Sequence, residues 1–198
     1  MTNHDSSNET LMASLDRALA GVGRLIAGVE AHQWSAPTPC VGWDVREIVD
    51  HLASGNLNFA ALVHDEPRPD RGPDQPTGDP VADYRSAAAT MRAAFAEPGV
   101  LERIYQSPIG SVPGAVLVHL RISELLVHSW DIAKATGQAA DLDPELGQET
   151  LAWARENLPP QFRGEEGSRL PFGPEVPAPD SAPLDDRLAA FFGRDPRR

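Results

Sequence analysis

The chain contains almost no cysteine and almost no lysine. Cys40 is its only cysteine, so no disulfide can form within the chain, and a reducing cytoplasm is the natural compartment. Lys134 is its only lysine, and the formal net charge is −12. A phosphate-binding surface needs clustered lysine and arginine, and the sequence shows no such cluster. The composition therefore argues against nucleic acid as a partner.

Long apolar runs are also missing. No stretch approaches the roughly 18 apolar residues of a membrane span. The opening "MTNHDSSNETL" is polar and slightly acidic, without the basic and apolar regions of a signal peptide. The chain has 198 residues, of which 41% are hydrophobic and 23% are charged. These values predict a cytoplasmic globular protein with one domain, or one domain and a short tail, and no membrane partner.

Helical periodicity dominates the sequence, and no run of residues convincingly predicts strands. Asp44 and Glu47, in "DVRE", have the spacing of a capping box and should start the second helix. Pro113 suits the first turn of the fourth helix, and Gly137 suits the position just after its end. The predicted helices cover Thr10–Ala31, Asp44 to about His64, Val81–Ala96, Pro113 to Gly137 and Pro144–Asn157.

The second and third helices are joined by sixteen residues rich in Pro, Gly and Asp, "DEPRPDRGPDQPTGDP". At about 3.3 Å per residue, this segment is long enough to run back along a helix, so the two helices could be parallel. We therefore predict an all-α four-helix bundle, antiparallel or mixed, with a long crossover between helices two and three. The bundle should occupy residues 1–160, and residues 161–198 should form a Pro/Gly-rich tail with one short helix that packs on it.

Glu124 and His128 lie four residues apart in the apolar stretch "ELLVHSWDIAKATG". On an α-helix both side chains project from the same face, with Arg121 and Asp131 close to the same line. One interpretation is a solvated polar stripe with a weak surface pair. The other is a binding site for a metal ion.

His51 borders the apolar face of the second helix, one turn before Gly55. A glycine there lowers helix propensity by about 1 kcal/mol, which suggests that another group needs the space. His51 taken alone reads as a histidine at the edge of the core. Two imidazoles and one carboxylate from two helices would nevertheless fill three positions around a divalent ion and leave one open.

The segments "APTPCVGWDVREIVDHLASG" and "SELLVHSWDIAKATG" together resemble the DinB-like superfamily. Within it they are most similar to the metal-binding domain of mycothiol-dependent maleylpyruvate isomerases and its uncharacterised actinobacterial relatives. The resemblance implies a four-helix bundle with a crossover, and metal ligands at His51, Glu124 and His128. The characterised isomerases also have a second, C-terminal domain, in place of which this chain has a short tail, so the resemblance does not carry over the substrate.

The resemblance implies a divalent metal, with zinc first and Ni, Fe or Mn as alternatives, and mycothiol as a cofactor. The function that follows is a thiol-dependent S-transferase or isomerase acting on a small electrophilic substrate. A non-catalytic protein that binds a metal or small ligand, and a metal-dependent hydrolase, remain alternatives, and a homodimer is left open. No catalytic or cofactor-binding residue is assigned.

Several other residues have open roles. His119 lies well around the helix from Glu124 and should have a packing or surface role. Asp131 either orients a ligand or forms a surface salt bridge. Cys40 shows no catalytic partner in the sequence and is interpreted as an incidental thiol. Trp43 and Trp130 are expected in the core.

Overall fold

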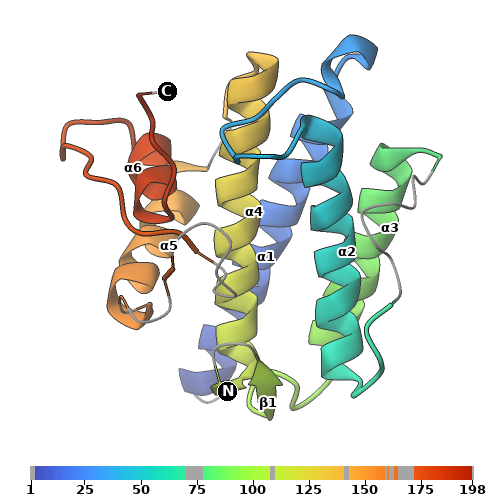
Figure 1. Cartoon of the computed structure of the whole chain (residues 1–198). Coiled ribbons are helices and arrows are strands. Elements are labelled where there is room, and N and C mark those ends of the chain that lie inside the picture. Colours follow the sequence, from blue (N-terminus) through green and yellow to red (C-terminus); the bar gives the residue numbers. More distant parts are fainter. Residues whose placement is uncertain are drawn as a thin grey trace.

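The structure is a computed structural model that describes residues 3–69, 78–107, 110–140, 143–158, 160, 163–164 and 172–197. It is mostly helical, as predicted, and adds one small sheet (Figure 1). The elements, in chain order, are α1 (Asn3–Ala27), a 3-10 turn (Ala31–Gln33), α2 (Val45–Val63), α3 (Pro80–Phe95), β1 (Ile104–Ser107), β2 (Gly110–Pro113), α4 (Gly114–Thr136), α5 (Pro144–Asn157) and α6 (Leu184–Phe191).

Helices α1 to α4 pack side by side around the core, and α2 and α3 run in the same direction. His64 caps the C-terminal end of α2, and its Nε2 lies 2.9 Å from Oε1 of Glu97, which follows α3. The ring of Phe59, one turn before the end of α2, has its centroid 6.4 Å from that of Phe95, the last residue of α3. The two C-terminal ends therefore lie together. Half of the predicted crossover that would join these helices, residues 70–77, lies outside the described residues.

Local capping explains where α2 begins. The Asp44 carboxylate accepts a hydrogen bond from the Glu47 backbone N–H, and the Glu47 carboxylate accepts one from the Asp44 backbone N–H. This is the predicted capping box, and it fixes the start of α2 one residue after Asp44. Gly137 ends α4 with φ +70, a left-handed conformation that glycine adopts without strain.

Two elements differ from the sequence prediction. Helix α1 begins at Asn3 and ends at Ala27, whereas the periodicity placed it at Thr10–Ala31. The antiparallel β1–β2 hairpin was not predicted. Each strand has only four residues, which is too short for the alternation that identifies a strand, and β2 ends in Pro113.

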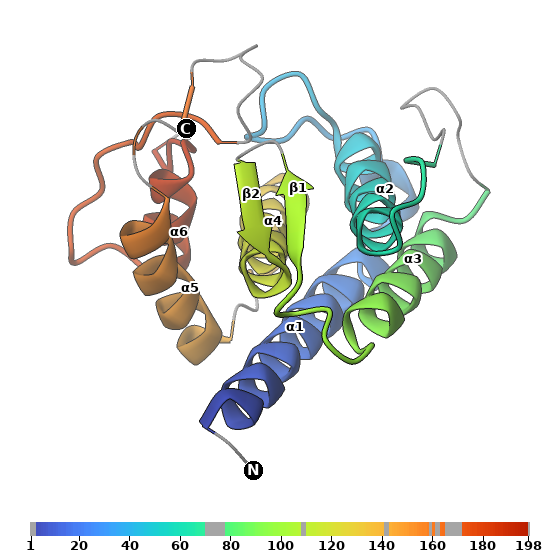
Figure 2. The ribbon, with the colours of Figure 1, turned by 90° about the horizontal axis from the view of Figure 1, so that it is seen from below.

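The C-terminal part of the chain packs against α4 on the side opposite α2. Figure 2 shows α5 and α6 on one side of α4, with α2 and α3 on the other. Trp130 Nε1 of α4 donates to Asp186 Oδ1 of α6 over 2.8 Å, and Lys134 Nζ lies 3.3 Å from the same oxygen. Among the described helices, none combines the length and apolar character needed to cross a bilayer.

Candidate functional site

Three of the four members of the polar stripe of α4 are buried, and the fourth, Glu124, has 22% of its side chain exposed. The side chains of Arg121 and Asp131 have no exposed surface, and His128 is 8% exposed. The interpretation of a solvated stripe is therefore wrong. Burying a charged side chain is unfavourable unless it is paired, so each member of this stripe needs a partner.

Three aromatic rings meet where α2 faces α4. The ring centroids of His51 and His128 lie 5.1 Å apart, with the rings steeply tilted at 69°. Trp43, in the loop before α2, stacks on His128 at 6.0 Å and contacts His51 edge-on at 4.7 Å. The two predicted histidine ligands are thus brought together, and a half-buried tryptophan covers them. The sequence interpretation of Trp43 as core missed this role.

Glu124, the third predicted ligand, is held by Arg121 one turn before it. Arg121 Nη1 donates to Glu124 Oε2 over 2.8 Å, and Arg121 Nε donates to Asn56 Oδ1 over 2.9 Å. The third guanidinium nitrogen, Nη2, donates to the Leu52 carbonyl oxygen. A fully buried guanidinium with three acceptors is held rigidly. It therefore fixes the position of the Glu124 carboxylate.

Gly55 provides the space that this guanidinium occupies. A Cβ added to Gly55 would lie 2.6 Å from Arg121 Nη1 and 3.1 Å from its Cζ. The glycine that the sequence singled out on α2 is therefore required by the arginine that positions Glu124.

The charge states of the predicted ligands suit a divalent ion. Burial lowers the pKa of His51 to about 3, with a smaller contribution from His128, so its imidazole is neutral at pH 7. Burial alone would raise the pKa of Glu124, but Arg121, His51 and His128 together hold that pKa below its ordinary value. Glu124 is then ionised. Two imidazoles and one carboxylate are a donor set that divalent transition metals accept, so the residues present fit such an ion.

A cavity of about 330 Å³ opens onto this site between α2 and α4, and its lining includes His51 and Glu124. From His51 the cavity follows α2 to Leu62, about 16 Å along a helix that rises 1.5 Å per residue. Its apolar walls are Phe59, Leu62, Leu117, Leu120 and Phe172, and its remaining lining is Gly55, Asn58, Glu66, Arg68, Gln106 and Ser107. Its volume lies at the lower end of the range for small-ligand sites.

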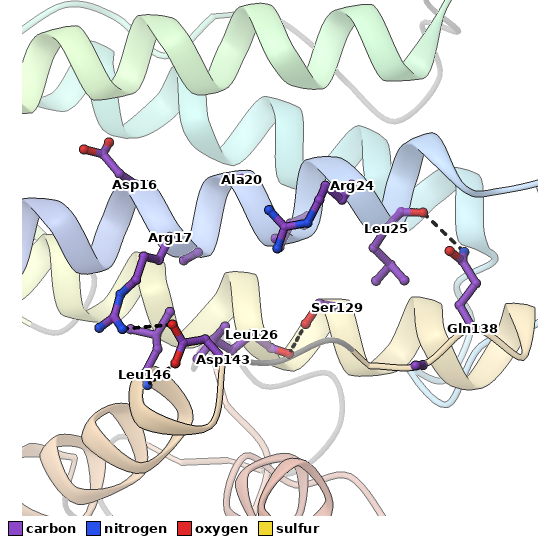
Figure 3. A pocket seen from close by; sticks show the side chains of 14 residues that line it. Asp16, Arg17, Ala20, Arg24, Leu25, Leu126, Ser129, Gln138, Asp143 and Leu146 are labelled. Carbon is purple, nitrogen blue, oxygen red and sulfur yellow. Dashed lines mark hydrogen bonds and ion pairs between the residues drawn. The ribbon is translucent and has the colours of Figure 1, made fainter.

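A larger cavity, of about 550 Å³, lies between α1, α4 and the start of α5 (Figure 3). Its polar groups largely bond to their neighbours: Arg17 Nη1 donates to Asp143 Oδ2 over 2.8 Å, and Gln138 Nε2 donates to the Leu25 carbonyl oxygen over 3.2 Å. None of the predicted ligands lines it. We therefore place the candidate site at the α2–α4 cavity.

The Nδ1 edge of His128 contacts a residue whose role the sequence left open. Asp131 Oδ2 lies 3.0 Å from His128 Nδ1, and Arg194 of the C-terminal tail binds both oxygens of the same carboxylate. A ligand atom of Cys40 lies within 4.8 Å of one from His128 and one from Asp131. Cys40 is thus part of a polar cluster, although the sequence indicated only an incidental thiol. The surface salt bridge considered for Asp131 is also excluded, because its side chain is buried.

The remaining residues from the sequence analysis lie away from this cavity. His119 stacks on Trp153 of α5, with ring centroids 4.5 Å apart, which is the first of the two predicted roles, packing or surface. Trp130 is completely buried and belongs to the core, also as predicted.

Comparison with known proteins identifies relatives along most of the chain. The family model for the mycothiol maleylpyruvate isomerase N-terminal domain matches residues 15–133. Two uncharacterised proteins of Mycobacterium tuberculosis, from strains CDC 1551 and H37Rv, are each 41% identical over 186 residues. Each alignment covers 94% of this chain and 98% of the relative.

Two crystal structures share the fold. Mycothiol-dependent maleylpyruvate isomerase aligns with a TM-score of 0.59 and 18% identity, over 83% of this chain and 76% of that one. A mutant of the same enzyme also gives a TM-score of 0.59, at 19% identity, over 77% and 71% of the two chains. At these identities the likeness shows the fold alone. Because the family model matches more than half of the residues, the chain belongs to the mycothiol maleylpyruvate isomerase N-terminal domain family.

Proposed function

We propose that the protein binds a divalent metal through His51, Glu124 and His128, and uses it to react a mycothiol-type thiol with a small electrophile. The observation that carries this proposal is the α2–α4 cavity, whose lining includes two of the three predicted ligands. A partly buried donor set, with a paired carboxylate, that opens onto a small-molecule cavity is the arrangement expected of a reactive centre.

When bound, a zinc-type ion lowers the pKa of a coordinated thiol and so supplies a thiolate at neutral pH. The chain's own residues prepare the site for it. Arg121 orients the Glu124 carboxylate, and burial keeps the His51 lone pair unprotonated. Trp43 covers the two imidazoles on one face, which limits the access of water from that side.

The apolar walls of the cavity would hold the electrophile next to the thiol. A thiolate that adds to an electrophilic carbon and expels a leaving group gives S-transfer. A thiolate that adds to a conjugated double bond, and is eliminated after rotation about that bond, gives isomerisation with no net change in composition. Both reactions need the same site, so we assign the chain to this pair of activities.

We also infer that α1 to α4 form the DinB-like four-helix bundle, with residues 64–79 as its crossover. The parallel course of α2 and α3 supports this inference, because two parallel helices need a connection as long as a helix. The contacts of α6 with α4 support a single domain in which residues 1–160 form the bundle and residues 161–198 pack on it.

Metal content after supplementation with zinc tests the ligand set. We expect about one ion per chain in the wild type, and loss of most of it in His51→Ala, Glu124→Gln and His128→Ala. Glu124→Gln is the sharpest of the three because it keeps the shape of the side chain and removes only its charge. His119→Ala is the control, since His119 lies on another face of the same helix. Near-stoichiometric metal in all three ligand variants would overturn the assignment.

A cobalt-substituted protein then tests the chemistry. Addition of mycothiol should produce thiolate-to-cobalt charge-transfer absorption, and the thiol should be consumed or recycled in the presence of a panel of small electrophiles. Normal cobalt loading without a spectral response to thiol would favour a hydrolase or a non-catalytic binding protein. Release of acid and alcohol or amine products from added esters or amides would separate those two alternatives, because only a hydrolase cleaves these bonds with water.

A further inference from the structure

We propose that Asp131 and Arg194 are positioning residues that hold His128 in the orientation and tautomer needed for metal binding. This inference rests on the proposed function of the site, because it assigns these residues to one of its metal ligands. Through Arg194, the C-terminal tail would then contribute to the metal site.

His128 and Asp131 are in direct contact. His128 Nδ1 lies 3.0 Å from Asp131 Oδ2, and both side chains are buried. A carboxylate can only accept a hydrogen bond, so Nδ1 must carry the proton. The lone pair of His128 is then on Nε2, the nitrogen remote from Asp131. A carboxylate behind a metal-binding imidazole is a known way to fix both its ring and its tautomer.

Asp131 is in turn bound by Arg194. Arg194 Nε donates to Asp131 Oδ1 over 3.0 Å, and Arg194 Nη2 donates to Asp131 Oδ2 over 2.9 Å. This two-point pairing keeps the carboxylate ionised and fixes its plane. Without Arg194, the buried carboxylate would lose its guanidinium partner.

Arg194 is itself fixed by its backbone. Its backbone N–H donates to the Ala189 carbonyl oxygen over 2.9 Å, at the end of α6. The preceding residue, Gly193, has φ +92, and a Cβ there would lie 2.8 Å from the Cα of Gly173. Only glycine fits this backbone position, so the turn that directs Arg194 toward α4 is specifically built.

The same cluster has one rival explanation. Ligand atoms of Cys40, His128 and Asp131 lie within 4.8 Å of one another, which would also suit direct binding of an ion by all three. Arg194 argues against it, because an ion at Asp131 would have to displace a guanidinium that already binds both carboxylate oxygens. The two explanations predict opposite effects of removing Arg194.

The test measures zinc affinity by competition with a chromophoric chelator, in full-length protein. Asp131→Asn and Arg194→Gln should each weaken zinc binding about 10- to 100-fold, the range found for residues that orient a metal ligand. Arg194→Lys should recover part of that loss. The double variant should be no weaker than Asp131→Asn alone, because Arg194 acts through Asp131. Arg197→Gln is the matched control, since Arg197 lies three residues further along the tail and pairs with Asp195.

A second readout separates orientation from general stability. In metal-free protein, the imidazole ¹⁵N shifts of His128 should show the Nδ1–H tautomer in the wild type and a mixture of tautomers in Asp131→Asn. A merely structural role would lower the melting temperature of both variants and leave the tautomer and zinc affinity of the folded protein unchanged, which would overturn the proposal. Tighter zinc binding in Arg194→Gln, with complete loss in Asp131→Asn, would establish the rival site. No metal in the wild type would overturn both this inference and the proposed function.

Discussion

Replacing Gly55 by alanine should destabilise this protein, although the same change stabilises most helices. Alanine favours the helix over glycine by about 1 kcal/mol at an interior position. Gly55 lies inside α2, so propensity alone predicts a more stable protein. The added Cβ, however, would lie 2.6 Å from Arg121 Nη1, where no atom can be accommodated without movement.

The magnitude follows from what Arg121 would lose by moving. Its guanidinium makes hydrogen bonds to Asn56 Oδ1, Glu124 Oε2 and the Leu52 carbonyl, all close to a fully buried arginine. A hydrogen bond to a charged group contributes about 1.5 to 3 kcal/mol, so disturbing one or two costs about 2 to 4 kcal/mol. After the gain in helix propensity, the net loss is about 1 to 3 kcal/mol. In a chain of this length, a loss of 2 kcal/mol lowers the melting temperature by about 4 to 8 °C.

Thermal unfolding of metal-free protein measures this effect, with Gly21→Ala as the control. Gly21 also lies inside a helix, but the nearest atom to its added Cβ is Arg24 Nη2 at 3.9 Å. That variant should be more stable than the wild type by up to about 1 kcal/mol. In an Arg121→Met background, Gly55→Ala should stop being harmful. A melting temperature that rises equally in Gly55→Ala and Gly21→Ala would refute the reasoning.

Three further predictions follow from the packing. Burial lowers the pKa of His119 to about 4. Between about pH 6.5 and 4 the unfolded state therefore binds more protons than the folded state, and the free energy of unfolding falls by up to roughly 3 kcal/mol as the pH is lowered. His119→Phe keeps a ring on Trp153 and should flatten this part of the profile in urea unfolding at pH 4.5 and 7; an unchanged slope would contradict the assignment. Gly114→Ala should lower stability by roughly 3 kcal/mol or more in urea unfolding, because its Cβ would collide with the backbone carbonyl of Val100. An unfolding midpoint equal to that of the wild type would show this contact to be wrong. Phe172→Ala should raise KM for the electrophile about tenfold or more at unchanged metal content, because a buried phenylalanine contributes about 1.5 to 3 kcal/mol; an unchanged KM would mean that the substrate binds elsewhere.

Features of the fold that depend on neighbouring residues could be predicted from the sequence. The capping box at Asp44 and the glycine end of α4 act within a few residues, and both were placed correctly. Gly55 could also be interpreted, because a glycine inside a helical pattern is unfavourable unless another group needs its space. The identity of that group could not be predicted, because Arg121 is sixty-six positions away along the chain. The sequence also left open whether the polar residues of α4 form a solvated stripe or a metal-binding site.

The partners of His128 lay beyond sequence reasoning for the same physical cause. Asp131 and Arg194 are sixty-three positions apart, and only the docking of α6 on α4 brings them together. Arg194 stands in a tail whose composition gives no periodic signal. The stacking of Trp43 on His128 likewise depends on how the loop before α2 folds over α4. The predicted set of His51, Glu124 and His128 remains a prediction until metal content is measured.

The parallel course of α2 and α3 has an electrostatic consequence. Each helix carries a partial negative charge of about half a unit at its C-terminal end, and in a parallel pair these two ends lie together and repel. Arg103 enters at this point: its Nη2 donates to the Val63 carbonyl oxygen at the end of α2, and its Nε donates to the Tyr105 hydroxyl over 2.7 Å. The segment that leads into the hairpin thus places a cation at the C-terminal end of α2, where it offsets the negative end of that macrodipole and weakens the repulsion. An uncharged residue at position 103 would leave that repulsion uncompensated, most strongly in low salt.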